Sequence, residues 1–309
     1  MLDTTYHGNT FIITNNNVYT ERRIIMLEKN VQTFIACDCE YDEAKIVMFG
    51  APFDSTTSFR PGTRFASQAM RSESFGIETF SVYQMKDMLD IKVFDSGDLE
   101  LPFGSPERAL DDIKERTATI LADGKIPCMI GGEHLVTLGA VRACAEKYPD
   151  LHVIQFDAHA DLREDYLGVK LSHACVMRRC QEILGDGRLF QFGIRSADKS
   201  EVEFVMQEHT SLNLFDFRTL REVAGYIGNA PVYFTLDMDV LDPSEFPGTG
   251  TPEAGGVRFD ELLDAIEVLS ELNIVGFDMN ELSPAYDPSG RSTALACKTM
   301  REMLLRFHG

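Results

Sequence analysis

Three side chains that can bind a metal ion alternate with alanines in the segment Asp157-Ala158-His159-Ala160-Asp161. The segment follows the apolar run of residues 151–156, which predicts a buried β-strand. Successive side chains of an extended strand point to opposite faces, so Asp157, His159 and Asp161 are expected on one side. Alone, such a cluster could also be a solvated strand end.

A second acidic cluster, Asp237-Met238-Asp239, follows the apolar residues 232–236 with the same spacing. Carboxylates packed this closely repel one another and are costly to desolvate unless a cation lies among them. His134 is a further candidate, because it follows the apolar run 126–130 and a Gly131-Gly132 turn that lets the backbone approach a bound group. Taken alone, His134 would be interpreted as a structural histidine. Beside two acidic strand ends, it becomes the sixth candidate ligand of a metal centre.

Four carboxylates and two imidazoles are too many ligands, and too hard, for one tetrahedral zinc ion. A carboxylate-rich N/O set suits Mn²⁺ or Mg²⁺, and the two histidines favour Mn²⁺. Carboxylates can bridge two ions about 3.5 Å apart, and such a pair lowers the pKa of a bridging water. The chemistry predicted is hydrolysis at an electrophilic carbon or phosphorus centre.

Eight apolar stretches are predicted to be the strands that position these side chains. They span residues 45–53, 91–94, 126–130, 151–156, 189–194, 212–217, 232–236 and 274–277. Helical patterns occupy residues 106–122, 134–147, 200–208, 259–272 and 292–307. This alternation predicts a single α/β domain over residues 1–309 with a mainly parallel sheet. Because ligands bind beyond the carboxyl ends of such strands, the polar residues that follow them predict one active site.

The composition is that of an ordinary globular protein, with 44% hydrophobic and 25% charged residues. A formal net charge of −20 argues against nucleic acid or an anionic membrane surface as a partner, and is compatible with a cationic substrate. The sequence shows no signal-peptide pattern and no window near the ~20 apolar residues of a membrane span. The seven cysteines match no zinc-finger or redox spacing, which favours reduced thiols in a cytoplasm. Residues 1–40 are polar and are expected to pack on the surface or against a neighbouring subunit.

Four blocks, in this order along the chain, resemble the signature blocks of the ureohydrolase (arginase and agmatinase) family. They are Gly131-Gly132-Glu133-His134, Asp157-Ala158-His159-Ala160-Asp161, Asp237-Met238-Asp239-Val240-Leu241-Asp242-Pro243 and Gly250-Thr251-Pro252-Glu253-Ala254-Gly255-Gly256. The resemblance runs from about Ile46 to the C-terminus. It implies the arginase-like three-layer α/β/α fold, with a mainly parallel sheet of about eight strands, and a site for two Mn²⁺ ions per chain. The implied ligands are the six candidates His134, Asp157, His159, Asp161, Asp237 and Asp239.

The resemblance also implies catalytic roles for three residues. His173, in Ser172-His173-Ala174, matches a loop histidine that shuttles protons, and an unperturbed imidazole pKa near 6.5 suits that role. Glu281 matches the glutamate that clamps the substrate guanidinium, which a carboxylate can hold through two hydrogen bonds. A hydroxide bridging the metal ions would attack the guanidinium carbon, and Asp161 would relay a proton to the leaving amine. Taken alone, His173 could be a surface histidine and Glu281 a salt-bridging acid.

The loop after Asp161 bears on the substrate within this family. Arginases typically carry an asparagine two positions after this ligand, where this chain has Arg163. The loop resembles that of the agmatinases, and its Glu164 and Asp165 are compatible with the second cation of agmatine. The expected reaction converts agmatine to putrescine and urea in a homo-oligomer, a trimer or hexamer. Aminopropylagmatine, guanidinobutyrate and arginine stay open as substrates, whereas formiminoglutamate would need a cation for its carboxylates.

Two other protein classes are also open. A catalytically silent member of the fold, acting as a regulatory or interaction protein, would be expected to lack one or more ligands, yet all six are present. A metal-dependent deacetylase, whose fold is related, keeps a single zinc ion, whereas His134 and Asp161 complete two sites here. Metal stoichiometry would discriminate between these classes.

Two further features have weaker implications. The loop of residues 54–64 is expected to be mostly structural. Asp98 follows another predicted strand, and could either support a ligand histidine or have a structural role at the strand end.

Overall fold

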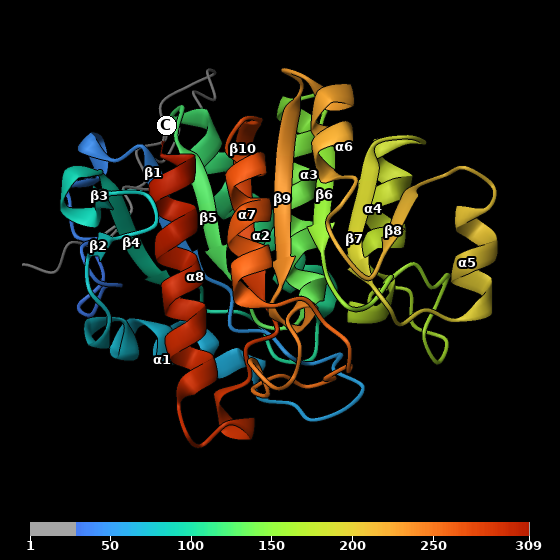
Figure 1. The fold of residues 1–309 in the computed structure, drawn as a ribbon, viewed down its shortest axis with the longest axis horizontal. Coiled ribbons are helices and arrows are strands. Elements are labelled where there is room, and N and C mark those ends of the chain that lie inside the picture. The colour runs from blue at the N-terminus through green and yellow to red at the C-terminus, as the bar shows by residue number, and fades with distance from the viewer. Residues whose placement is uncertain (1–28, 309) are drawn as a thin grey trace, which may run out of the picture.

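The computed structural model describes residues 29–308, whose centre is an eight-stranded sheet in the order β4-β1-β5-β10-β9-β6-β7-β8 (Figure 1). Every strand pairing in this sheet is parallel, which confirms the predicted fold class. The strands are β1 (Ile46–Gly50), β4 (Val93–Asp98), β5 (Ile126–Ile130), β6 (His152–Phe156), β7 (Leu189–Ile194), β8 (Ser211–Leu214), β9 (Pro231–Asp237) and β10 (Asn273–Asn280). Each matches a predicted stretch, with bounds that differ by a few residues.

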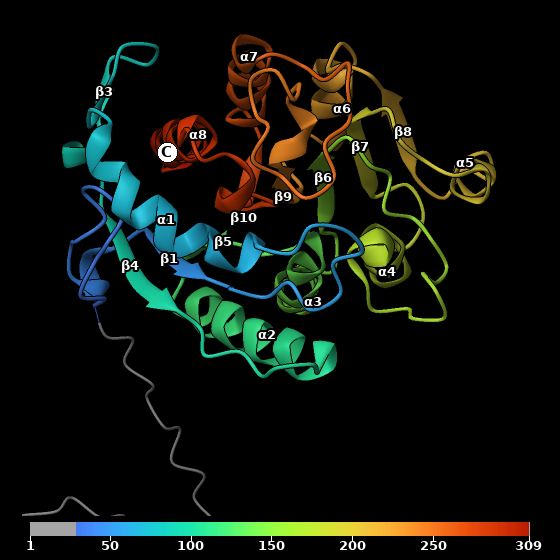
Figure 2. The ribbon, with the colours of Figure 1, turned by 90° about the horizontal axis from the view of Figure 1, so that it is seen from below.

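Helices cover both faces of the sheet, which gives three layers (Figure 2). One face carries α1 (Ala66–Glu73), α6 (Leu220–Ile227), α7 (Phe259–Leu269) and α8 (Arg291–Phe307). The other carries α2 (Pro106–Ala122), α3 (Thr137–Lys147) and α4 (Val176–Leu184), and α5 (Lys199–Val205) lies beyond β8 at the edge. Helix α8 runs opposite to the strands, so its C-terminal end lies at the edge where the strands begin (Figure 1).

Three helices and a hairpin are absent from the sequence prediction. Helices α1, α4 and α6 have nine residues or fewer, shorter than the window over which a helical pattern is usually recognised. The hairpin of β2 (Phe80–Ser81) and β3 (Lys86–Asp87) packs against α8, where the Ser81 hydroxyl donates to Glu302 at 2.7 Å. The predicted helix 134–147 begins as a 3₁₀ turn, His134–Val136, before α3.

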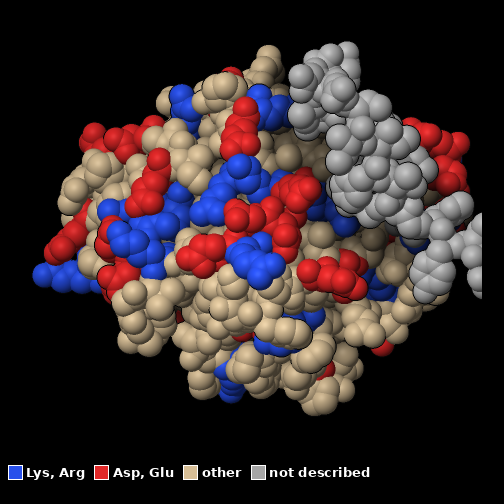
Figure 3. All heavy atoms as spheres, turned by 180° about the vertical axis from the view of Figure 1, so that it is seen from behind, with Lys and Arg blue, Asp and Glu red and all other residues tan. Residues whose placement is uncertain are grey.

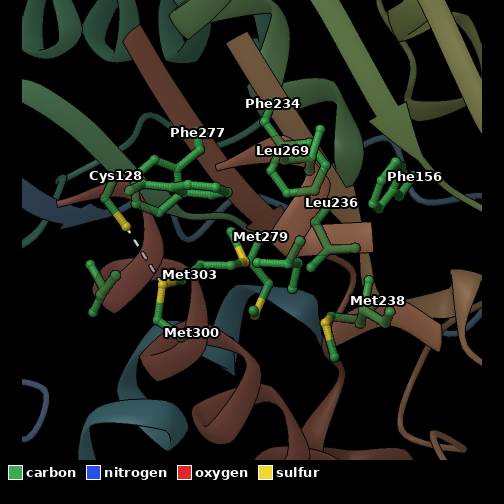
Figure 4. Close-up of a cluster of buried hydrophobic side chains, with 14 of the residues drawn as sticks. Cys128, Phe156, Phe234, Leu236, Met238, Leu269, Phe277, Met279, Met300 and Met303 are labelled. Atoms are coloured by element: carbon green, nitrogen blue, oxygen red, sulfur yellow. Dashed lines mark hydrogen bonds between the residues drawn. The ribbon is translucent and has the colours of Figure 1, made fainter. Parts of the chain in front are cut away.

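The core between the sheet and helices α7 and α8 is built from aromatic and sulfur-containing side chains (Figure 4). Phe234 on β9 and Phe277 on β10 are fully buried there, and Met300 and Met303 project from α8. The Cys128 thiol lies 3.6 Å from the Met300 sulfur. All seven cysteines are free thiols, consistent with the absence of zinc-finger spacing.

Asp98 has a structural role, which excludes its predicted support of a ligand histidine. The buried guanidinium of Arg71 contacts Asp95 at 2.8 Å and Asp98 at 2.5 Å, and the Ser67 hydroxyl donates to Asp98 at 2.9 Å. Of the N-terminal segment, residues 29–40 lie across β4, where Phe34 is fully buried and its N–H donates to Asp95. Residues 1–28 lie outside the described part of the chain.

Basic and acidic side chains are interspersed on the face formed by α2, α3 and α4 (Figure 3). Lys114 on α2 contacts Glu146 on α3 at 2.5 Å, and Arg179 contacts Glu182 within α4 at 2.6 Å. Much of the charge on this face is therefore paired. None of the helices in residues 29–308 has the length and hydropathy needed to cross a membrane.

Candidate metal centre and active-site cavity

The sheet brings the carboxyl ends of β5, β10, β9 and β6 side by side, at the lower edge in Figure 1. Parallel pairing sets Leu236 beside Phe156 and Met279 beside Ile130, so these four strands end at nearly the same level. Each strand is followed at once by candidate site residues. They are His134 after β5, Asp157, His159 and Asp161 after β6, Asp237 and Asp239 at the end of β9, and Glu281 after β10.

Two triads of potential ligands meet at Asp157. In the first, the Nδ1 atom of His134 lies 2.9 Å from Asp157 and 3.3 Å from Asp237. In the second, the Nδ1 atom of His159 lies 3.5 Å from Asp157 and 3.0 Å from Asp239. Asp161 lies beside the first triad, 3.5 Å from the same nitrogen of His134. All six predicted ligands are therefore together, and Asp157 belongs to both triads.

The local backbone differs from the extended strand that the alternation predicted. Strand β6 ends at Phe156, and Asp161 has a φ of +54°, in the left-handed region. After β9, Asp239 lies on a 3₁₀ turn, Met238–Val240. The backbone N–H of Asp239 donates to the Asp237 carboxylate at 2.8 Å. The prediction of extended alternation was therefore wrong. The side chains converge because each chain segment bends as it leaves its strand.

Without a bound cation, burial and mutual repulsion favour the protonated forms of several groups in the cluster. Burial raises the pKa of the Asp161 and Asp237 carboxyls well above their usual range, and neighbouring carboxylates add to the effect. Burial alone would lower the pKa of His134, but the Asp157 and Asp237 carboxylates outweigh it and raise that pKa. The cluster therefore favours positive charge at its centre, whether protons or metal ions supply it.

The residues present fit a pair of divalent cations. The buried atoms His134 Nδ1 and Asp239 Oδ2 make no hydrogen bond within the described residues. The other ring nitrogen of His134, Nε2, lies 2.8 Å from the Thr235 hydroxyl, which leaves Nδ1 to face three carboxylates. Buried polar atoms are rarely left without a partner, and metal-binding histidines usually engage their second nitrogen in this way. The donor set of oxygens and imidazole nitrogens suits Mn²⁺ or Mg²⁺.

Glu281 is buried beside the triads and lines the same cavity. One of its oxygens accepts the backbone N–H of His134 at 2.7 Å, and its φ of +64° places it, like Asp161, in the left-handed region. Such backbone strain persists only where the surrounding structure imposes it, as at many active sites. Burial, together with the charge of Glu133, raises the pKa of Glu281 to about 8.

His173 begins a 3₁₀ turn, His173–Cys175, and also lines the cavity. Its Nδ1 lies 2.9 Å from the Thr56 carbonyl oxygen and its Nε2 lies 3.1 Å from the Ser58 hydroxyl. Burial lowers the pKa of His173 to about 4, so the ring is neutral at pH 7 rather than titrating near its ordinary value. The loop of residues 54–64, expected to be mostly structural, thus contributes to the cavity.

The cavity has a volume of about 220 Å³. Beyond the triads it is lined by Arg163, Tyr166, Asp198 and Glu201. Arg163 lies over the Tyr166 ring at 5.2 Å and contacts Asp198 at 2.5 Å. The carboxyl groups of Glu201 and Asp198 therefore give this end of the lining an acidic character, with Arg163 as the basic residue beside them.

Two residues near the triads were missed by sequence reasoning. Gln155, in the middle of β6, donates to Asp157 at 2.6 Å. Arg195 donates to the backbone oxygens of Asp239 at 2.7 Å and Glu253 at 2.9 Å, which fixes the chain that leaves β9. A glutamine within an otherwise apolar predicted strand could have been noticed in the sequence. The contacts of Arg195 depend on tertiary structure and have no such signal.

The metal-free protein is expected to lose stability as the pH rises from about 5 to about 8. In the unfolded chain Glu281 ionises near its usual value of 4.5, whereas in the folded chain it does so at about 8. Within this window the folded state binds more protons, so the free energy of unfolding falls as the pH rises. Calorimetry should show a Tm lower by several degrees at the higher pH, and a larger gain in Tm on adding Mn²⁺ there. A metal-free Tm that is constant across this range would contradict the expectation.

Comparisons with known proteins identify relatives of this chain. The arginase family model matches residues 44–305. The agmatinase of Bacillus subtilis (strain 168) is 44% identical over 279 residues, covering 89% of this chain and 96% of the relative. The N(1)-aminopropylagmatine ureohydrolase of Thermococcus kodakarensis is 39% identical over 265 residues, covering 83% and 88%. The crystal structure of a candidate agmatinase from Clostridium difficile is 48% identical, with a TM-score of 0.85 over 87% of this chain and 99% of that one.

Proposed function

The chain belongs to the arginase family, and from that membership we propose that it is an agmatinase, which hydrolyses agmatine to putrescine and urea. The observation that carries the proposal is the pair of triads joined at Asp157, with the carboxyl of Glu281 in the same cavity. Such a site combines a place for two cations with a buried acid that can hold a guanidinium. The relatives with agmatinase activity in their names match most of the chain, which supports agmatine over other guanidino compounds.

We propose that six residues, the five of the two triads together with Asp161, hold two Mn²⁺ ions per chain. When bound, the ions would lower the pKa of water and so supply a hydroxide nucleophile at neutral pH. Glu281 would bind two guanidinium nitrogens and orient that carbon. Asp161, at the edge of the first triad, would pass a proton to the leaving amine. His173 would exchange a proton with solvent through its Nε2 atom, which lies beside Ser58 in the cavity lining.

The distal ammonium group of agmatine needs a carboxylate in the cavity lining. Both oxygens of Glu201 are engaged, since they accept the N–H groups of Leu162 at 2.8 Å and Asp198 at 2.7 Å. Asp198 is the better candidate, because its side chain is one-third exposed and its Oδ2 contacts the guanidinium of Arg163, which is itself about one-third exposed. We propose that Asp198 receives the distal ammonium group.

Asp198→Asn is expected to lower kcat/KM for agmatine by about 10- to 100-fold, mainly through KM. This range corresponds to the loss of one charge-assisted hydrogen bond. Asparagine is also a good N-cap, so the start of α5 should be preserved. Guanidinobutyrate, which ends in a carboxylate, is the control substrate, and its kcat/KM should not fall. Equal losses for both substrates would remove Asp198 from the binding site.

The proposed function is tested by urea release from Mn²⁺-loaded protein with agmatine, arginine, guanidinobutyrate and aminopropylagmatine. Agmatine should be preferred by about a hundredfold in kcat/KM, or about 2.7 kcal/mol. No urea from any of the four, with two metal ions bound, would exclude a ureohydrolase. One tightly bound zinc ion per chain, with hydrolysis of acetylated amines, would instead indicate a deacetylase.

We further propose that the enzyme acts in the cytoplasm as a homo-oligomer, a trimer or hexamer. Its free thiols support a reducing compartment, and the resemblance to the family supports assembly. Light scattering coupled to size exclusion would measure the oligomer directly. A monomer at micromolar concentration would contradict the assembly.

A further inference from the structure

Glu133 is a fully buried carboxylate beside the metal centre that none of the roles above uses. It follows the Gly131-Gly132 turn after β5 and directly precedes His134. No ion pair to Glu133 occurs within residues 29–308. Its two oxygens instead accept hydrogen bonds from one loop: from the Thr56 N–H at 3.0 Å, the Thr56 hydroxyl at 2.5 Å and the Thr57 hydroxyl at 2.9 Å. A buried carboxylate with three donors from one loop anchors that loop.

The anchored loop makes three contacts with His173. The Thr56 hydroxyl accepts the backbone N–H of His173 at 3.3 Å, and the Thr56 carbonyl oxygen lies 2.9 Å from the ring Nδ1. The Ser58 hydroxyl lies 3.1 Å from the ring Nε2. A carbonyl oxygen can only accept, so Nδ1 carries the proton and the lone pair of Nε2 faces Ser58. Ser58 and His173 both line the cavity, so this tautomer places the basic nitrogen beside Ser58 in the cavity lining.

We propose that Glu133 is a positioning residue for His173: through Thr56 it holds the imidazole in the Nδ1–H tautomer, with Nε2 facing Ser58 and the cavity. The proposal rests on the role of His173 in proton exchange proposed above. It assigns a task to a residue whose position beside His134 would otherwise suggest a role in the metal centre. Without the carboxylate, the Thr56 N–H and two threonine hydroxyls would lose their acceptor, and the loop would no longer fix the ring.

A double-mutant cycle between Glu133 and His173 tests the proposal. Glu133→Ala should lower kcat for urea release about tenfold or more, with KM for agmatine changed less than about threefold. In a His173→Ala background, Glu133→Ala should cause no further loss, because the ring that it positions is gone. Glu133→Gln should retain much of the activity, since its amide oxygen can still accept from Thr56. Additive effects of the two substitutions would overturn the proposal.

Glu302→Ala is the matched control, because Glu302 on α8 is also buried. Its partners, the Ser81 hydroxyl and the Arg301 guanidinium, lie outside the cavity. Its kcat should equal that of the unsubstituted protein. Metal content of Glu133→Ala, measured by mass spectrometry, should also be unchanged. Loss of metal from this variant would assign Glu133 to the metal centre and overturn the inference.

Hydrogen exchange provides a readout that does not depend on turnover. In Glu133→Ala of the Mn²⁺-loaded protein, the amides of residues 55–58 and 172–175 should exchange faster, while those of α7, residues 259–269, should not. Unchanged exchange in both segments would overturn the proposal. If the unsubstituted protein released no urea from any guanidino compound, the proposed function would fail, and the exchange result would still decide whether Glu133 holds the His173 segment.

Discussion

Asp157→Asn is expected to lower kcat for urea release by about 10⁴-fold and to leave fewer than two metal ions per chain. Asp157 belongs to both triads, 2.9 Å from His134 and 3.5 Å from His159, so one substitution weakens both proposed ion sites. A loss of 10⁴ corresponds to about 5.5 kcal/mol, within the several kcal/mol that a metal ion contributes to stabilising developing charge. The expected effect is larger than for Asp161, which lies at the edge of one triad only.

Metal content and urea release should be measured on the same preparation of Asp157→Asn. Asp287→Asn is a suitable control, because Asp287 is also buried but accepts hydrogen bonds from Ser289 and Ser292, away from the triads. The control should keep both ions and its kcat. An Asp157→Asn protein that binds two ions and turns over normally would refute the shared site.

Glu281→Gln is expected to lower kcat/KM for agmatine about 10³-fold, or about 4 kcal/mol. The substitution keeps the size of the side chain but removes the charge that would balance a buried guanidinium, and losing one partner of such a pair costs about 3–5 kcal/mol. Because the ionised carboxyl binds the cation, kcat/KM should rise with pH through the pKa of Glu281. That pKa is about 8 in the metal-free protein, and bound cations would lower it.

Initial rates at low agmatine concentration, taken from about pH 6 to pH 9, give the measurement. Glu281→Gln should lose the part of the pH profile that belongs to Glu281, while its metal content stays at the unsubstituted level. A variant with unchanged kcat/KM would show that the guanidinium is held elsewhere in the cavity.

The sheet and the gathered site could be predicted because both depend on local patterns. Strands buried on both faces, such as β7 and β9, are mostly apolar runs, and these can be recognised in the sequence. Strand ends in a parallel sheet lie at one edge, so the acids after β6 and β9 were expected there, and the structure makes these two strands neighbours. The cost of burying several carboxylates together then indicated a cation.

The remaining features depend on contacts between distant parts of the chain. The left-handed backbone of Asp161 has no local signal, because aspartate at a strand end is also compatible with an extended conformation. Thr56 and His173 are 117 residues apart in sequence, and no pattern in either segment reveals that they touch. The pKa of His173, about 4, follows from burial that only the folded loop provides. Short helices such as α6 gain most of their stability from packing their apolar face on the sheet, and so few residues give only a short pattern to recognise in the sequence.

The direction of α8 has a practical consequence for handling the protein. The helix ends at Phe307, and the next residue, His308, accepts the N–H of Lys92 at 3.1 Å, just before β4 begins. This end of the helix is at the upper edge in Figure 1, whereas the cavity is lined by residues that follow the strand ends at the lower edge. A linker placed after His308 would therefore attach the protein to a resin or an electrode with the cavity turned outward. Diffusion of agmatine to an immobilised layer would then be unobstructed by the support.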